Sequence, residues 1–284
     1  MNKKALIFIC LLTAFMPASA ISSTPTPVQK TCPVGGKFFT YIATNSLSTW
    51  GKRPDGKPYT SWIAPMPMAV CPDNGLVIYK DFSKEEIALL EKLIRTPEYI
   101  SLRSEVPRYR AAWLLKKLDS SKILSRLWLL NEASWESDGD AKRKARYQRE
   151  FAEGVAALPP QVDDSVWLNL QIYAANAWRE LGDLSRAQAI LGALPLAALE
   201  VAPGPNATKE ELAAAQAKQS VAARANSISE VIKRGDTSSE PLSLIPTRIA
   251  AQKCRDLEIR SPASVEGFCK SVDMQTRIEM MRQN

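Results

Sequence analysis

The sequence predicts a mainly α-helical protein with a small, disulfide-linked β module near its N-terminus. Three observations predict this fold class. Residues 32–82 carry short β-type runs separated by Pro- and Gly-rich turns. At Ser83 the apolar spacing changes to a helical period, which continues to about residue 195. Four cysteines follow the first 20 residues, and an even number is typical of disulfides in an exported chain.

Residues 1–20 have the pattern of a secretory signal peptide. Lys3 and Lys4 precede an apolar run over residues 5–16, which is short for a membrane span, and Ala18-Ser19-Ala20 forms an A-x-A cleavage site. We expect cleavage after Ala20 and a soluble protein located in the periplasm or secreted. No later segment is apolar enough to predict a transmembrane helix.

Composition narrows the possible chemistry. Cleavage leaves 264 residues, in which 35 basic residues stand against 30 acidic ones, a net charge of +5. This excess favours anionic partners only weakly, and the compartment argues against nucleic acid. The sequence contains no histidine, which excludes Ser-His and Cys-His nucleophile systems and histidine metal ligands. We expect no cofactor, and any catalysis would depend on carboxylates, lysine, tyrosine or an unassisted thiol.

The four remaining cysteines allow three disulfide connectivities. We favour Cys32–Cys71 and Cys254–Cys269, because the first two lie in matching Cys-Pro-x-x-Gly turns and the second two in one helical segment. On the chain-entropy model, such loops stabilise the fold by about 3.9 and 3.1 kcal/mol. A zinc site is the competing interpretation, but two turns with one thiolate each supply only half of a structural site.

Residues 21–31 are rich in Pro, Ser and Thr and predict a flexible leader. In the β module, 32–82, residues 38–42 suit a strand, and 52–57 (KRPDGK) suit a tight turn. Residues 64–68 (APMPM) must be extended, and 76–79 suit a last short strand.

Helices are expected from Ser83 onward. Ser83 and Glu86 form a capping box, and the first helix ends at Thr96-Pro97. Further helices are predicted near 107–118, 122–136, 140–157, 165–181 and 184–194. Residues 196–206 predict a linker. The C-terminal segment, 207–284, predicts one long helix to about 234 and two final helices after 246.

Residues 174–195 (AANAWRELGDLSRAQAILGALP) are similar to the inner part of a tetratricopeptide repeat. Gly182 suits the tight turn between two helices, and Ala187 permits their close approach. We therefore expect residues 83–195 to form a helical, repeat-like array.

The stretch 45–62 combines aromatic and charged side chains. One interpretation is a ligand surface for sugars, peptides or anionic polymers. The other is a hairpin whose aromatic residues pair across strands and pack on the first helix. The candidate binding residues are Trp50, Lys52, Arg53, Asp55, Tyr59 and Trp62, with Lys57 beside them.

Other charged and aromatic groups have simpler interpretations. The basic run at 142–149 predicts a solvated helix face, or else a docking surface for an acidic partner. The carboxylates Glu132, Glu136, Asp138 and Asp140 show no pair at a fixed gap, as a glycosidase requires. Five tryptophans at helical positions are expected in the core: Trp113, Trp128, Trp135, Trp167 and Trp178.

Two short motifs carry a resemblance to a known family. Cys32-Pro33…Gly36 and Cys71-Pro72…Gly75, followed by the Leu181-Gly182 repeat signature, resemble an uncharacterised bacterial family. Its intracellular members carry full C-P-x-C-G zinc knuckles ahead of a region of tetratricopeptide-like helices. Gly35 and Asn74 stand where the knuckles have cysteine. The resemblance therefore implies a degenerate zinc-ribbon-like module without the metal, and it implies architecture without an activity.

These observations predict an exported, non-catalytic binding or scaffold protein. It would use the helical surface and the aromatic and basic N-terminal module to bind a protein or an envelope polymer. One alternative is a carboxylate-dependent enzyme acting on envelope polysaccharide. The other is a structural, oligomer-forming protein.

Overall fold

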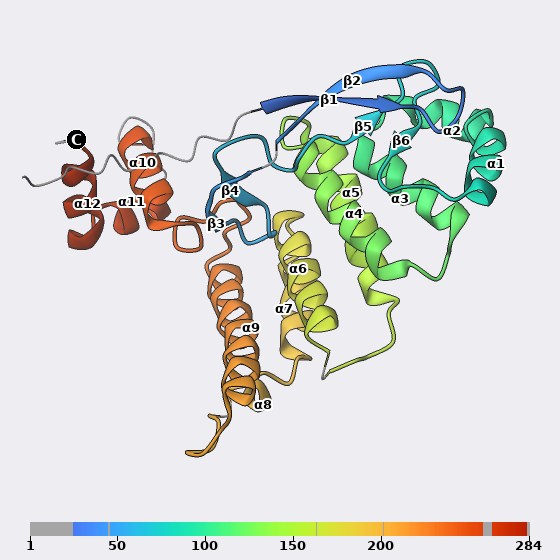
Figure 1. Cartoon of the computed structure of the whole chain (residues 1–284). Coiled ribbons are helices and arrows are strands. Elements are labelled where there is room, and N and C mark those ends of the chain that lie inside the picture. Colours follow the sequence, from blue (N-terminus) through green and yellow to red (C-terminus); the bar gives the residue numbers. More distant parts are fainter. Residues whose placement is uncertain (1–24, 45, 163, 201, 258–262, 283–284) are drawn as a thin grey trace, which may run out of the picture.

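A computed structural model describes residues 25–44, 46–162, 164–200, 202–257 and 263–282. The predicted signal peptide, residues 1–20, lies outside this part of the chain. The described chain is mainly helical, with a small region of antiparallel strands at its N-terminal end (Figure 1), which confirms the predicted fold class.

The β region consists of three antiparallel strand pairs and not one continuous sheet. The pairs are β1 (Pro25–Thr31) with β2 (Phe38–Thr44), β3 (Thr49–Lys52) with β4 (Pro58–Thr60), and β5 (Ala69–Val70) with β6 (Val77–Ile78). Each pair is a hairpin, so the connections between strands are local in sequence.

The structure differs from the expected leader at residues 25–31, which form β1. Pro25 pairs with Thr44 and Thr31 with Phe38 in an unbroken register. Pro25 and Pro27 occupy alternate positions, which face the same edge of the strand. Two prolines on one edge leave the other edge free to pair, so the Pro-rich composition did not prevent a strand.

The two Cys-Pro-x-x-Gly turns share one backbone geometry and are joined to each other. Gly36 donates its N–H to the carbonyl of Cys32 at 3.2 Å, and Gly75 donates to the carbonyl of Cys71 at 3.0 Å. Both sulfur atoms are buried in a disulfide, Cys32–Cys71, and a second disulfide joins Cys254 to Cys269. The favoured pairings are therefore the observed ones.

Asn74 and Gly35, which stand where a zinc knuckle has cysteine, have other structural roles. The Asn74 side chain donates to the carbonyl of Val34 and accepts from the N–H of Leu76, both at 2.9 Å, and so bridges the two turns. Gly35 has a φ of +87°, and a Cβ there would lie 3.2 Å from Asp73 Oδ2. A disulfide and an amide bridge thus close the module.

A run of helices follows this module. The helices are α1 (Lys84–Leu93), α2 (Pro97–Ser101), the 3₁₀ turn η1 (Leu102–Ser104), α3 (Pro107–Leu118), α4 (Ile123–Glu136), α5 (Ala141–Ala156), α6 (Ser165–Glu180), α7 (Leu184–Gly192), α8 (Leu196–Leu199) and α9 (Lys209–Lys233). The predicted capping box of Ser83 and Glu86 starts α1. The short α8 lies inside the expected linker, 196–206.

From α3 to α7, each helix packs against the next one in the chain, and α9 packs against α6, α7 and α8. Gly182 turns the chain between α6 and α7 with a φ of +84°. The largest hydrophobic core lies among these helices and includes Trp167 and Trp178. Trp128 packs against it half-buried, and Trp113 packs against the Cys32–Cys71 core.

The C-terminal segment has three short helices after residue 246, where two were expected. They are α10 (Thr247–Leu257), α11 (Ala263–Cys269) and α12 (Val272–Arg282), and Cys269 is the last residue of α11. This segment has a small core of its own around Cys254, Met274 and Ile278, against which Tyr59 of β4 packs. In Figure 1 the β3–β4 hairpin lies between the C-terminal helices and the helical array.

Candidate functional site

The tip of the β3–β4 hairpin is inserted against the helices. Arg53 donates its N–H to the carbonyl of Lys57 at 2.8 Å, and Gly56 donates to Arg53 at 2.9 Å, which forms the predicted turn. A Cβ at Gly56 would lie 3.1 Å from the Tyr173 ring of α6. As a result Arg53 and Asp55 are buried, with 8% and 3% of their surface exposed.

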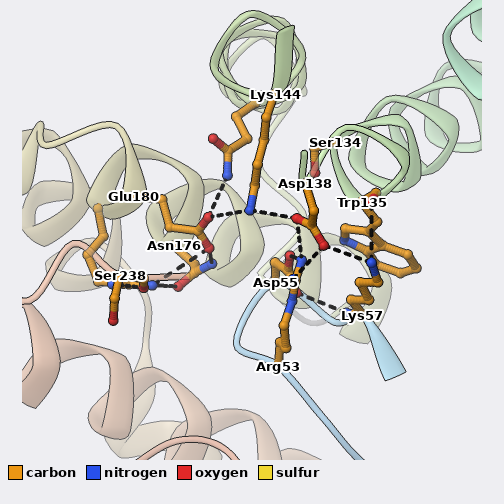
Figure 2. Close-up of polar contacts among 12 residues, drawn as sticks. Arg53, Asp55, Lys57, Ser134, Trp135, Asp138, Lys144, Asn176, Glu180 and Ser238 are labelled. Atoms are coloured by element: carbon orange, nitrogen blue, oxygen red, sulfur yellow. Dashed lines mark hydrogen bonds and ion pairs between the residues drawn. The ribbon is translucent and has the colours of Figure 1, made fainter. Parts of the chain in front are cut away.

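A group of ion pairs holds the buried tip, and we call it the hairpin network: Arg53, Asp55, Lys57, Asp138, Lys144 and Glu180 (Figure 2). Arg53 pairs with Asp55 and with Asp138, the latter at 2.7 Å. Lys57 and Lys144 approach the same Asp138 carboxylate at 2.7 and 3.0 Å. One carboxylate in the turn after α4 therefore receives three cations from two other segments.

The hairpin network continues into α6. Lys144 lies 3.2 Å from Glu180, whose carboxylate also accepts hydrogen bonds from Gln148 and Asn176. Arg179 is completely buried and donates to the carbonyls of Asp236 and Ser238 at 2.6 and 2.8 Å. These contacts tie the hairpin, α5, α6 and the segment after α9 into one unit.

Electrostatics keeps Asp138 and Lys144 charged at neutral pH. Burial opposes ionisation of Asp138, but hydrogen bonds from Arg53 and Lys57 and the charges of Arg53 and Lys144 outweigh it and hold its pKa far below the usual range. Burial also opposes the charge on Lys144, yet Glu180 and Asp138 raise its pKa. Neither group is poised to exchange a proton near pH 7, so the network has the properties of a structural clamp.

Tyr59 extends the same contacts to the C-terminal helices. Its hydroxyl donates to Glu240 at 2.6 Å, and Glu240 pairs with Lys253 of α10 at 2.6 Å. Burial and then the hydrogen bond to Glu240 raise the pKa of Tyr59 well above that of a free phenol. A cavity of about 360 Å³ lies between Tyr59, Lys57 and Lys144, and each charged group that lines it has an ion-pair partner.

The structure divides the predicted binding residues. Arg53, Asp55 and Tyr59 come together in contacts with the helices, and Trp62 is half-buried. Trp50 keeps 47% of its surface exposed, and Lys52 is exposed beside it. The hairpin packs on α6 and Pro246, because Gly56 lies against Tyr173 and Gly51 against Pro246. The first helix, which the packing interpretation invoked, is not among these neighbours.

The local sequence carries no signal that joins Asp138, Lys144 and Glu180 to the hairpin. Lys144 belongs to the basic run at 142–149, whose pattern predicts a solvated helix face or a docking surface for an acidic partner. Of that run, Arg143 and Arg146 approach Glu105 at 3.6 and 2.5 Å, while Lys144 points into the hairpin network. The sequence changes from acidic at Asp138-Gly139-Asp140 to basic at 142–149. This local change does not show which residue pairs with Lys144.

The carboxylates considered for acid–base chemistry also have structural partners. Glu132 and Glu136 each lie 2.6 Å from the buried Arg108, and Asp140 accepts the N–H of Arg143 at the start of α5 at 3.0 Å. Burial raises the pKa of Glu136, although Arg108 acts in the opposite direction. Its carboxylate is nevertheless fixed by an arginine, which leaves it poorly placed to transfer a proton to a substrate.

A metal could use few groups in the N-terminal module. Cys32, Cys71 and Asp73 place one sulfur or oxygen each within 4.8 Å of the others. The two sulfurs are bonded to each other, so this arrangement offers no thiolate. The donor set of the disulfide form therefore does not fit a structural zinc ion.

No protein-family model, curated protein or solved structure matches this chain. Across the described ranges, no helix combines the length and apolar character that crossing a bilayer requires.

Proposed function

We propose that this chain is an exported, non-catalytic binding or scaffold protein whose partner is a protein or an envelope polymer. The observation that carries the proposal is the division of the β3–β4 hairpin. Its buried charges are used in the hairpin network, while Trp50 and Lys52 remain exposed on a hairpin held against the helices.

Rigidity favours binding at this place. An aromatic side chain on a fixed backbone loses little conformational freedom when a partner covers it, so more of the contact energy becomes affinity. Tryptophan is also enriched among residues that dominate binding energy. Ile63 and Phe38, in the same N-terminal region, are exposed by 57% and 74%, which adds apolar surface.

Export is supported by two independent features. The first 20 residues have the signal-peptide pattern, and both disulfides join buried or half-buried cysteines in a chain of ordinary size. Disulfides persist in oxidising compartments, which include the periplasm and the extracellular space. The enzyme alternative has weaker support, because the candidate carboxylates are fixed in ion pairs.

The test compares Trp50→Ala with a matched control, Leu89→Ala, which removes a side chain of α1 that is 49% exposed. Each purified, oxidised variant is immobilised and incubated with envelope extract, and a retained component is titrated back after purification. We expect wild type and Leu89→Ala to bind it equally, and Trp50→Ala to bind it at least about 30-fold more weakly, the effect of losing about 2 kcal/mol at a binding hot spot.

Two results would contradict the proposal. Equal binding by Trp50→Ala and wild type would remove the hairpin from the binding surface. Release of soluble sugar from purified envelope polysaccharide by the wild-type protein would establish the enzyme alternative. Light scattering of the same preparation tests the third possibility, since a structural oligomer would be present without any partner.

A further inference from the structure

A second cavity lies at the hairpin, and its lining differs from that of the hairpin network. Its volume is about 460 Å³, within the range of small-molecule sites. The turn after β3, α6, α9 and the segment 243–246 contribute its walls. The side chains that matter here are Lys52, Tyr173, Arg224, Ser227, Ile228 and Ser243.

The cavity has cations without anions. No aspartate or glutamate is among the residues that line it. Arg224 is half-buried and directs one nitrogen, Nη1, to Asn169 Oδ1 at 2.7 Å and to the Tyr173 hydroxyl at 3.2 Å, both neutral acceptors. Within the described ranges, neither Arg224 nor Lys52 is paired with a carboxylate.

Charged side chains elsewhere at the hairpin are paired with opposite charges. Arg53 also borders the cavity, but its guanidinium is neutralised by Asp55 and Asp138. A partly desolvated arginine that lacks a counter-charge is costly for the folded protein, and an anion from solution would remove that cost. The remaining Nε and Nη2 donors of Arg224 suit an oxyanion, which arginine binds through two nitrogens at once.

Hydroxyl and apolar groups complete the lining. Ser227 and Ser243 are exposed, but Ser227 donates its hydroxyl proton to the carbonyl of Ala223 at 2.8 Å. Ser243 accepts a hydrogen bond from Arg234 at 2.8 Å, which leaves its own proton available to donate. Ile228 and Ile245 are buried in the wall. Several donors beside an apolar wall match a tetrahedral oxyanion that is attached to a small apolar body.

The walls are held in place without a ligand. The backbone at Gly51 lies so close to Pro246 that a Cβ at this position would overlap the proline ring. Arg179 holds the carbonyls of Asp236 and Ser238, just before the segment that forms one wall. A site that exists before binding spends little energy on its own ordering.

We propose that this cavity binds the phosphate group of a phosphate monoester, with Arg224 and Lys52 as the charged ligands and the Ile228 wall against the organic part. This proposal does not depend on the partner binding proposed above. Arg224 lies on α9, and although Lys52 belongs to the exposed hairpin, Trp50, the residue that tests partner binding, does not line the cavity.

The experiment is isothermal titration of the oxidised full-length mature protein with phenyl phosphate at constant ionic strength. We expect saturable binding by wild type and at least about tenfold weaker binding by Arg224→Gln, in which a charge-assisted hydrogen-bonding group is lost. Lys52→Ala should also weaken binding, and Arg224→Lys should restore part of it. Lys218→Ala, an exposed cation on the same helix, is the matched control and should bind like wild type.

Further titrations and a vesicle assay identify which kind of phosphate compound binds and how specific the cavity is for phosphate. Inorganic phosphate should bind more weakly than phenyl phosphate, and benzoate should bind far more weakly still. Arg224-dependent co-sedimentation with vesicles of phosphatidic acid in phosphatidylcholine would assign the phosphate to a lipid. Binding of phenyl phosphate alone would assign it to a soluble compound. Either result supports the site.

The proposal is overturned if wild type binds neither phenyl phosphate nor the phosphatidic acid vesicles. It is also overturned if benzoate binds as well as phenyl phosphate, or if Arg224→Gln binds like wild type. Lys52→Ala shows whether a loss of binding comes from the site or from misfolding, since the exposed Lys52 side chain can be removed with little effect on the fold. Trp50→Ala separates the two proposals, because it should keep the affinity for phenyl phosphate even where partner binding is lost.

Discussion

Asp138 is the residue of the hairpin network whose carboxylate meets three cations. Its carboxylate is approached by Arg53, Lys57 and Lys144 from two different segments, yet it follows α4 directly in a turn. Ion pairs of this kind add little net stability, because desolvation offsets most of the attraction. Removing one member is costly, since the remaining charges stay buried without a partner. The network therefore selects one arrangement of the hairpin.

Asp138→Asn should lower the free energy of unfolding at pH 7 by about 2–4 kcal/mol, between the values for an exposed and a buried pair, because one third of the Asp138 side chain is accessible. The folded-state pKa of Asp138 is depressed, so its contribution is complete above the unfolded pKa of about 3.9 and is lost as pH falls toward the folded value.

Urea unfolding of wild type and Asp138→Asn at pH 7 and pH 3 checks this prediction. The difference between the two proteins should be largest at pH 7 and smaller at pH 3. Asp256→Asn, whose side chain is 60% accessible, is the control and should change stability little at either pH. A difference that grew on acidification would contradict the assignment.

At the scale of single elements, close helix contacts decide where glycine is needed. Gly154 of α5 faces α4, and a Cβ there would lie 2.5 Å from Cδ2 of the fully buried Leu127. Gly192, at the end of α7, has open space around it and no positive φ. The two glycines have the same effect on helix propensity but opposite packing environments.

Gly154→Ala should therefore destabilise the protein by about 1–2 kcal/mol, because overpacking outweighs the gain in helix propensity. Gly192→Ala should stabilise it by up to about 0.5–1 kcal/mol, since only the propensity changes. Thermal unfolding of both variants should shift in opposite directions. A rise in the melting temperature for both would show that Leu127 can move aside at no cost.

Over the whole molecule, the described chain has three separate cores, and each disulfide belongs to a small one. Cys32–Cys71 lies with Leu76, Leu90 and Tyr99 under the N-terminal helices. Cys254 lies in the core of the C-terminal helices. The large core between them contains no cysteine. Small cores bury too little apolar surface to be independently stable, which is why covalent bonds are useful in these two places.

Replacing Cys32 and Cys71 together by serine should cost about 3.9 kcal/mol, and replacing Cys254 and Cys269 about 3.1 kcal/mol, on the chain-entropy model. The first change should expose amides of the N-terminal module and α1–α3 to hydrogen exchange. The second should affect α10–α12 and leave α3–α7 protected. Exchange spread evenly over the chain in either variant would contradict the division into separate cores.

Local patterns predicted the longer helices from α1 to α9 well, because their signals lie within a few residues, but they did not predict the short α2 and α8. The capping box at Ser83 and the turn at Gly182 are where the sequence placed them. The strand at 25–31 was not predicted, since its stability comes from pairing with β2 and not from its own Pro-rich composition. The third C-terminal helix was likewise missed, because its boundaries lie in a weakly periodic segment that is stapled by a disulfide.

The sequence by itself determined the helical class, the turn at residues 52–57 and the chemistry that is missing without histidine. It also identified the aromatic and basic stretch as unusual. Only the tertiary structure decided which of those residues face inward. Arg53 and Asp55 are buried because Asp138, Lys144 and Glu180 lie opposite them, about 80 to 130 positions away in the chain. Charge pairing at such separations has no local period, so it becomes visible only when the helices are packed.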